Sequence, residues 1–225
     1  MFSPSQLFDL ENLSIKDVFD SVDQAYEILG TPLKEYCKKL KGREIHGTVM
    51  EGATLVGDGI YIGEGTVVEP GAFIKGPAYI GKNTEIRHSA YIRGNVVVGD
   101  NCVVGHCTEV KMSIFLDGAK AGHFAYVGDS ILGNNVNLGA GTKLANLKII
   151  ESDIVLHTDT GDKVVTGLRK MGAILGQKVE IGCNAVTSPG TILAPKSMVY
   201  PAIGIKGAYS KRVVLREANM VKKKA

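Results

Sequence analysis

The chain has 225 residues, of which 44% are apolar and 22% charged, and this balance fits one soluble globular domain and excludes a disordered chain. Its 28 glycines, 6% aromatic content and lack of Trp indicate an aliphatic core and a backbone that turns often, which excludes a large helical bundle. Residues 210–225 hold six Lys or Arg and one Glu, so the net charge of +3 leaves −2 over residues 1–209 and argues against nucleic-acid binding.

The first predicted element is an amphipathic helix over residues 14–29. Ser14 can cap its start, and apolar side chains recur at helical spacing up to Leu29. Gly30 and Pro32 are interpreted as its end. We expect an N-terminal helical cap over residues 1–45 that closes one end of the domain.

A six-residue repeat follows and dominates the chain. Aliphatic side chains occupy every sixth position at Val56, Ile62, Val68, Ile74, Ile80, Ile86, Ile92, Val98, Val104 and Val110. Neither a helix nor a single alternating strand selects this period. It predicts short strands whose inward side chain is followed by a tight corner, with three faces closing one 18-residue coil of a parallel all-β solenoid. The pattern resembles the left-handed parallel β-helix of hexapeptide-repeat proteins, and this resemblance supplies the handedness.

The predicted β-helix covers residues 46–205, with two kinds of interruption. The phase slips by one residue at Phe115 and again at Leu132, and such slips re-aim corners, so we expect functional residues nearby. Residues 147–171 break the repeat and predict an extended outer loop, in which residues 159–162 read as a hairpin turn. The repeat returns at Leu175, Ile181, Thr187, Leu193 and Val199. Residues 206–225 are expected to form a basic tail that includes Lys222–Lys224, while the pattern also allows a short helix or a β-arm.

Two motifs in the middle of the repeat point to a family. Residues 119–129 contain KAGH and YxGD, and residues 134–142 contain NVNxGAGT. Over about residues 50–200 the chain resembles the acetyltransferase half of the bifunctional glucosamine-1-phosphate acetyltransferase/N-acetylglucosamine-1-phosphate uridylyltransferase family, in its archaeal-type branch. The resemblance implies an N-acyltransferase that uses acetyl-CoA or another acyl-CoA and acts on a phosphorylated or nucleotide-linked amino sugar, such as glucosamine-1-phosphate.

The resemblance also implies a set of site residues. His123 matches the general base and Glu109 the carboxylate that orients it; an ammonium must lose a proton before it attacks a thioester, and imidazole titrates near neutral pH. Matches to substrate-binding positions are Arg93, Lys111 and Lys170 around the sugar phosphate, and Tyr126 and Asn137 at the sugar. Matches to coenzyme-binding positions are Ala140, whose N–H can stabilise the oxyanion, Asn146 and Cys183. No metal is needed.

The residues themselves leave other interpretations open. His88, His106 and His123 each follow an inward residue by two positions and should stack on one corner, where a surface ladder is the favoured interpretation for His88 and His106. Arg93 and Lys111 could form a solvated basic strip. Asn137 could be a ladder amide within a coil.

The chain departs from the bacterial family at three points. Residues 146–149 read Asn-Leu-Lys-Ile in place of Asn-Tyr-Asp-Gly, and Cys183 replaces a serine. No Gly-rich nucleotidyltransferase signature is present, and about 50 residues before the repeats are too few for that domain, so we expect no uridylyl transfer.

Partners and location complete the expectations. The resemblance implies a homotrimer with clefts between prisms, and we expect no nucleic-acid or membrane partner. Without a signal peptide or a CxxC pair, the protein is expected in the cytoplasm with reduced thiols. Two alternatives remain: a non-catalytic trimeric scaffold that binds a sugar nucleotide, and a carbonic-anhydrase-like metal enzyme, although the usual pair of histidines five apart is absent. The amino sugar and the acyl length are left open.

Overall fold

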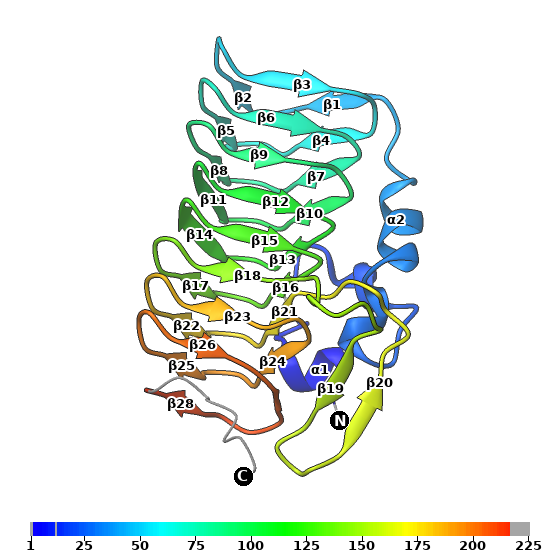
Figure 1. The fold of residues 1–225 in the computed structure, drawn as a ribbon. Coiled ribbons are helices and arrows are strands. Elements are labelled where there is room, and N and C mark those ends of the chain that lie inside the picture. The colour runs from blue at the N-terminus through cyan, green and yellow to red at the C-terminus, as the bar shows by residue number, and fades with distance from the viewer. Residues whose placement is uncertain (1, 12, 217–225) are drawn as a thin grey trace.

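The chain forms a left-handed parallel β-helix with a layer of short helices along one side (Figure 1). The computed structural model describes residues 2–11 and 13–216. Up to β18, each coil adds one strand to each of three parallel sheets, which we name A, B and C, so every third strand pairs. The predicted all-β, left-handed parallel β-helix is therefore confirmed.

The strands are two to four residues long. Sheet A contains β1 (Arg43–Ile45), β4 (Ile60–Ile62), β7 (Ala78–Ile80), β10 (Val96–Val98), β13 (Ile114–Phe115), β16 (Ile131–Leu132), β21 (Ala173–Leu175), β24 (Thr191–Leu193) and β27 (Ala208–Tyr209). Sheet B contains β2 (Thr48–Val49), β5 (Val67–Val68), β8 (Glu85–Ile86), β11 (Val103–His106), β14 (Lys120–His123), β17 (Asn137–Leu138), β22 (Glu180–Ile181), β25 (Met198–Val199) and β28 (Val214–Leu215). Sheet C contains β3 (Thr54–Val56), β6 (Phe73–Lys75), β9 (Tyr91–Ile92), β12 (Glu109–Lys111), β15 (Tyr126–Gly128), β18 (Lys143–Leu144), β23 (Val186–Thr187) and β26 (Gly204–Ile205).

The predicted repeat fills the prism, with one exception. Residues 18 apart pair in register, as in Ile62 with Ile80 and Ile80 with Val98, and these side chains are fully buried. The prediction for Val56 was wrong, because its side chain is 40% exposed. Leu55 pairs with Ile74 instead and packs against the core, so the first coil contains one more residue than the repeat assumes.

The predicted slips correspond to two shortened coils. Val98 pairs with Phe115 and Phe115 with Leu132, and both steps are 17 residues. The missing residue is in the corner that connects sheet C to sheet A, which we name the C–A corner. Buried serines tie this corner: Ser113 Oγ donates to the Lys111 carbonyl at 2.7 Å, and Ser130 Oγ donates to the Gly128 carbonyl at 2.8 Å.

The N-terminal segment differs from the expected single helix. It contains α1 (Pro4–Leu7), the 3-10 turns η1 (Lys16–Phe19) and η2 (Ala25–Ile28), and α2 (Thr31–Cys37). The prediction of a helix ending at Gly30 and Pro32 was wrong, because Pro32 lies in the first turn of α2. A proline there has no N–H to lose from helical bonding, so it marks a helix start as readily as an end.

This segment covers the outside of sheet A and does not close the end of the prism (Figure 1). It packs on outward aliphatic side chains of β10, β13, β16, β21 and β24, among them Val97, Ile114 and Ile131, all fully buried. Strands that are apolar on both faces need a cover outside as well as a core inside. The expected end cap is thus a side layer.

The outer loop and the C-terminal coils complete the structure. Between β18 and β21 an antiparallel hairpin of β19 (Val155–His157) and β20 (Lys163–Val165) leaves the prism, which confirms the predicted turn between them. We name residues 147–171 the insertion. The coils continue through β27 and β28, so residues 206–216 belong to the solenoid rather than to the expected tail, and Lys222–Lys224 lie outside the described residues. None of the helices in the described part of the chain is long and apolar enough to cross a membrane.

Candidate acyl-transfer site

The predicted histidine column exists at the corner between sheets B and C. The His88 and His106 rings stack at 5.8 Å with 9° between their planes, and His106 pairs in register with His123. The ring nitrogen Nδ1 of His88 lies 2.7 Å from the Pro70 carbonyl oxygen. His123 is exposed, and within residues 2–11 and 13–216 its ring has no hydrogen-bond partner. Among the described residues it is therefore the only one of these three rings without a hydrogen bond.

Two further predicted residues continue this column in the next coils. The Gly141 N–H donates to the His123 carbonyl at 3.1 Å, and the Asn184 N–H donates to the Ala140 carbonyl at 2.8 Å. These bonds place Ala140 directly after His123 in the column, with Cys183 following in the coil beyond. Among the described residues the Ala140 N–H has no acceptor. Since adjacent coils are about 4.8 Å apart, a base and an unused backbone donor lie side by side.

A second group of predicted residues lies on the outer face of sheet C. Arg93 NH1 donates to Glu109 Oε1 at 2.6 Å, and Glu109 pairs in register with Tyr126. The hydrogen bond with Glu109 raises the pKa of Arg93. Glu109 begins a strand of sheet C whereas His123 ends a strand of sheet B, and no hydrogen bond joins the two side chains in the described structure. In the structure Glu109 thus pairs with Arg93, whereas the resemblance implies that Glu109 orients His123.

Lys111 lies at the C–A corner and faces a carboxylate that we did not predict. Its Nζ is 2.7 Å from Asp129 Oδ2, and Asn146 Nδ2 donates to the same oxygen. The Tyr126 hydroxyl donates to Asn146 Oδ1 at 3.4 Å. Asp129 and Asn146 are buried, with 6% and 9% exposed. The sequence signal for Asp129 was the YxGD motif, to which no role had been attached.

Tyr126 connects these two clusters. Burial raises its pKa, and the negative charges of Glu109 and Asp129 raise it further. Its hydroxyl therefore stays protonated at neutral pH and acts as a donor.

Lys170 reaches the same corner from the insertion. The Met171 N–H donates to the Asn146 carbonyl at 3.1 Å, so the two ends of the insertion are bonded together. Lys170 is exposed and directly precedes this junction. The structure thus brings Lys170 next to Asn146.

Asn137 does not join either group. It lies on the outer face of sheet B, in register with Lys120 and Glu180, and its Nδ2 donates to Glu180 Oε2 at 3.1 Å. This arrangement matches the ladder interpretation within one chain. No group of three or more His, Cys, Asp or Glu that could hold a metal ion is found in the described residues.

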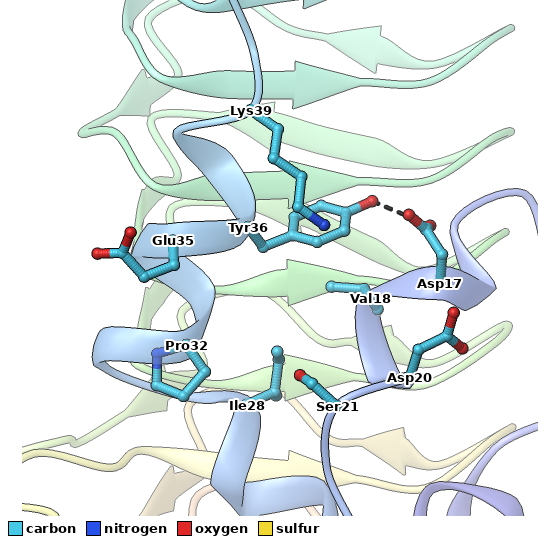
Figure 2. Close-up of a pocket in the computed structure, with 9 residues that line it drawn as sticks. All are labelled: Asp17, Val18, Asp20, Ser21, Ile28, Pro32, Glu35, Tyr36 and Lys39. Atoms are coloured by element: carbon cyan, nitrogen blue, oxygen red, sulfur yellow. Dashed lines mark hydrogen bonds between the residues drawn. The ribbon is translucent and has the colours of Figure 1, made fainter.

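A cavity of about 340 Å³ lies away from all of these residues, in the N-terminal layer (Figure 2). The Tyr36 hydroxyl donates to Asp17 Oδ1 across it at 3.1 Å, and the Lys39 ammonium lies 5.0 Å from the Tyr36 ring centre. Burial and then the Asp17 carboxylate raise the pKa of Tyr36. None of the predicted site residues lines this cavity.

Two archaeal proteins match part of this chain. A bifunctional sugar-1-phosphate nucleotidylyltransferase/acetyltransferase of Sulfurisphaera tokodaii is 39% identical over 93 residues, which are 41% of this chain and 23% of that protein. A bifunctional protein GlmU of Methanococcus maripaludis is 37% identical over 92 residues, 41% of this chain and 22% of that protein. The matched segment is therefore less than a quarter of these two relatives. Both matches confirm the resemblance to the bifunctional family.

Among solved structures, the chain is similar to the UDP-N-acetylglucosamine acyltransferase of Francisella novicida, with a TM-score of 0.49 and 17% identity over 72% of this chain and 60% of that one. The sequence model of the family described as GMPPB C-terminal domain matches residues 74–206, which is more than half of the chain and includes every predicted site residue. The chain belongs to the family of GMPPB C-terminal domains.

Proposed function

We propose that the protein is an acyl-CoA-dependent N-acyltransferase that acts on a phosphorylated or nucleotide-linked amino sugar, with acetyl-CoA and glucosamine-1-phosphate as the first substrates to test. One observation carries the proposal. Within the described residues neither the ring of His123 nor the N–H of Ala140 has a hydrogen-bond partner, and the two groups occupy successive positions of one corner column.

The two groups suit the two halves of an acyl transfer. His123 takes the proton from the ammonium of the amino sugar, and the freed amine attacks the thioester carbonyl. The Ala140 N–H then donates to the oxyanion that forms on that carbonyl oxygen. When the tetrahedral intermediate collapses, the carbon–sulfur bond breaks and the nitrogen releases its second proton to water as the neutral amide forms. The imidazolium returns its proton to the departing thiolate of coenzyme A.

The sheet C residues are assigned to the acceptor. Arg93, Lys111 and Lys170 provide positive charge for the phosphate, and Tyr126 provides a protonated hydroxyl for the sugar. Glu109 acts here by holding Arg93.

Three assignments rest more on the resemblance. Asn146 and Cys183 are assigned to the coenzyme, and Asn137 to the sugar of a site completed by a neighbouring subunit. The two archaeal relatives, a bifunctional sugar-1-phosphate nucleotidylyltransferase/acetyltransferase and a bifunctional protein GlmU, support the substrate class.

The exposed sheets support a homotrimer as part of this proposal. The N-terminal layer covers the outer face of sheet A, whereas it leaves the outer faces of sheets B and C uncovered. Phe124, at the corner between sheets B and C, is 52% exposed. Flat uncovered β surfaces are normally buried by self-association, and clefts between prisms would then enclose the column of His123. Four free cysteines and a coenzyme A substrate support a cytoplasmic location.

The changed segment after Asn146 favours a second candidate, a trimer that binds a sugar nucleotide without turnover. Leu147, Ile149 and Ile150 are exposed there, and none can donate a side-chain hydrogen bond to a sugar. Binding of a sugar nucleotide without acyl transfer would select this candidate.

Release of free thiol from acetyl-CoA tests the proposal. The purified protein is incubated with glucosamine-1-phosphate or galactosamine-1-phosphate, and the product is identified by mass spectrometry as the N-acetyl sugar phosphate. Acceptor-dependent thiol release supports the proposal. A folded trimer that releases no thiol with either sugar phosphate or with their nucleotide-linked forms would refute it.

A further inference from the structure

The C–A corner contains a buried carboxylate that the proposed mechanism does not use. Asp129 belongs to the YxGD motif and has only 6% of its surface exposed. We propose that Asp129 is a positioning residue of the acceptor site, which fixes the Lys111 ammonium and the Asn146 amide and holds the insertion closed beside them. This inference rests on the proposed function.

Asp129 Oδ2 accepts hydrogen bonds from two predicted site residues at once. Lys111 Nζ lies 2.7 Å away, and the Lys111 side chain is only 19% exposed. Asn146 Nδ2 is the second donor. Burying an ammonium or an amide without a hydrogen-bond partner costs free energy. The Asp129 carboxylate removes this cost for both donors and fixes the direction in which each of them points.

The contact also fixes which way the Asn146 amide faces. A carboxylate can only accept, so the NH₂ group of Asn146 must point to Asp129. Its carbonyl oxygen then points to the Tyr126 hydroxyl, which donates to it at 3.4 Å. Asp129 therefore sets the orientation of Tyr126 through Asn146, without touching Tyr126 itself.

The backbone at this corner position accommodates an aspartate. Asp129 has φ of +48°, in the left-handed region that Asp and Asn enter more readily than other side chains. Met112 takes the same conformation one coil earlier, at φ of +46°, so the corner permits Asp129 but does not require an acid. The case for Asp129 therefore rests on its side-chain contacts.

The backbone of Asp129 ties the end of the insertion to the site. The Gly172 N–H donates to the Asp129 carbonyl at 2.8 Å, and the Met171 N–H donates to the Asn146 carbonyl at 3.1 Å. A Cβ on Gly172 would lie 2.4 Å from the Gly128 carbonyl oxygen, so the backbone segments at residues 128 and 172 leave no room for a side chain there. Lys170, the residue before this junction, is held beside Asn146 by the same bonds.

The test compares Asp129→Asn with the wild type in the acyl-transfer assay. Asparagine keeps the shape and one acceptor oxygen, but it removes the negative charge and puts an NH₂ donor in place of the second oxygen. The ion pair with Lys111 is therefore lost, and the hold on the Asn146 amide is weakened. We expect the KM for the amino-sugar phosphate to rise about tenfold or more while kcat changes less, because the acceptor is misplaced and His123 is untouched. Asn146→Ala should then add little to Asp129→Asn, since both variants break one chain of contacts.

A matched control and a second readout keep the result interpretable. Asp100 is another corner carboxylate, and it accepts a hydrogen bond of 2.7 Å from the Lys82 N–H. It lies at a different corner from the site, so Asp100→Asn should leave KM unchanged. Amide hydrogen exchange in residues 146–172 should become faster in Asp129→Asn and not in Asp100→Asn, whether or not the protein turns over any sugar.

The outcomes separate the two proposals. A wild type without turnover refutes the proposed function, and exchange at residues 146–172 then decides alone whether Asp129 holds the site. A wild-type KM and unchanged exchange in Asp129→Asn would refute the positioning role even if acyl transfer is confirmed. If KM rises and kcat falls by equal factors, and if Asp129→Asn and Asp100→Asn behave alike, the effect is general destabilisation. That result would also refute the positioning role.

Discussion

His88 and His123 occupy equivalent corner positions, yet they differ in what surrounds them. The sequence places both two residues after an inward aliphatic side chain, and the stacked corner follows from that spacing alone. Their partners could not be predicted, because the Pro70 carbonyl comes from the preceding coil and its distance depends on the corner geometry. The same limit applies to Glu109, whose contact with Arg93 across two coils is not visible in a spacing.

The four cysteines should separate into two reactivity classes. Burial raises the pKa of Cys37 and of Cys102 to about 12, so neither forms a thiolate near neutral pH, whereas Cys107 and Cys183 are exposed. A thiol reagent at pH 7.5 should modify Cys107 and Cys183 in the native protein and all four residues after denaturation. Peptide mass spectrometry identifies the sites, and rapid native labelling of Cys37 or Cys102 would contradict the burial described.

At the scale of an element, the coil was the most predictable unit. A six-residue period predicts both the strand and its inward side chain, and the one-residue slips correctly marked the 17-residue steps from Val98 to Phe115 and from Phe115 to Leu132. The N-terminal segment was less predictable for a physical reason. Its packing depends on outward aliphatic residues such as Val97 and Ile114, and the six-residue repeat identifies only the inward ones. In addition, a proline such as Pro32 is as compatible with the start of a helix as with its end.

The close stacking of coils gives a paired prediction. A Cβ on Gly105 would lie 1.8 Å from the Gly122 carbonyl oxygen of the next coil, whereas a Cβ on Gly122 would meet nothing within 4 Å. Gly105→Ala should therefore lower the free energy of unfolding by about 1–3 kcal/mol or more, through overpacking against backbone. Gly122→Ala should change it by no more than about 0.5 kcal/mol.

Chemical denaturation of both variants measures this difference. Gly105 and Gly122 occupy equivalent positions in successive coils, so the comparison isolates the spacing of β11 and β14. Equal effects of the two substitutions would mean that these coils are not stacked as described.

For the whole molecule, the asymmetry of the solenoid matters most. One sheet is covered by the chain's own N-terminal layer, and the other two remain available for neighbours, substrate or both. Composition and repeat predicted the solenoid and its outer hairpin, but they could not show which face the N-terminal layer would cover. That choice places the proposed site on the uncovered side.

The packing of the N-terminal layer on sheet A should become less stable at alkaline pH. Burial raises the pKa of Tyr79 and of Cys37 to about 12, above the ordinary values of 10.0 and 9.0. The folded state thus favours the protonated forms, and this stabilisation is complete below about pH 9 and is lost as the pH rises toward 12. The free energy of unfolding, measured at pH 8 and pH 10.5, should be lower at pH 10.5.

Tyr79→Phe is the control for this pH dependence. It keeps the ring that stacks on Tyr61 at 4.8 Å and removes the ionisable hydroxyl, so the loss between the two pH values should be smaller. An identical loss in Tyr79→Phe would exclude Tyr79 as a contributor.

The most direct test of the central claim compares His123→Ala with His88→Ala in the thiol-release assay. Both variants remove an exposed imidazole from the same corner column, so they share any general effect on the coils. If His123 is the general base, His123→Ala should lose turnover by roughly 10² or more, and His88→Ala should stay near the wild-type rate. Turnover that survives in His123→Ala, or falls equally in both variants, would contradict the account.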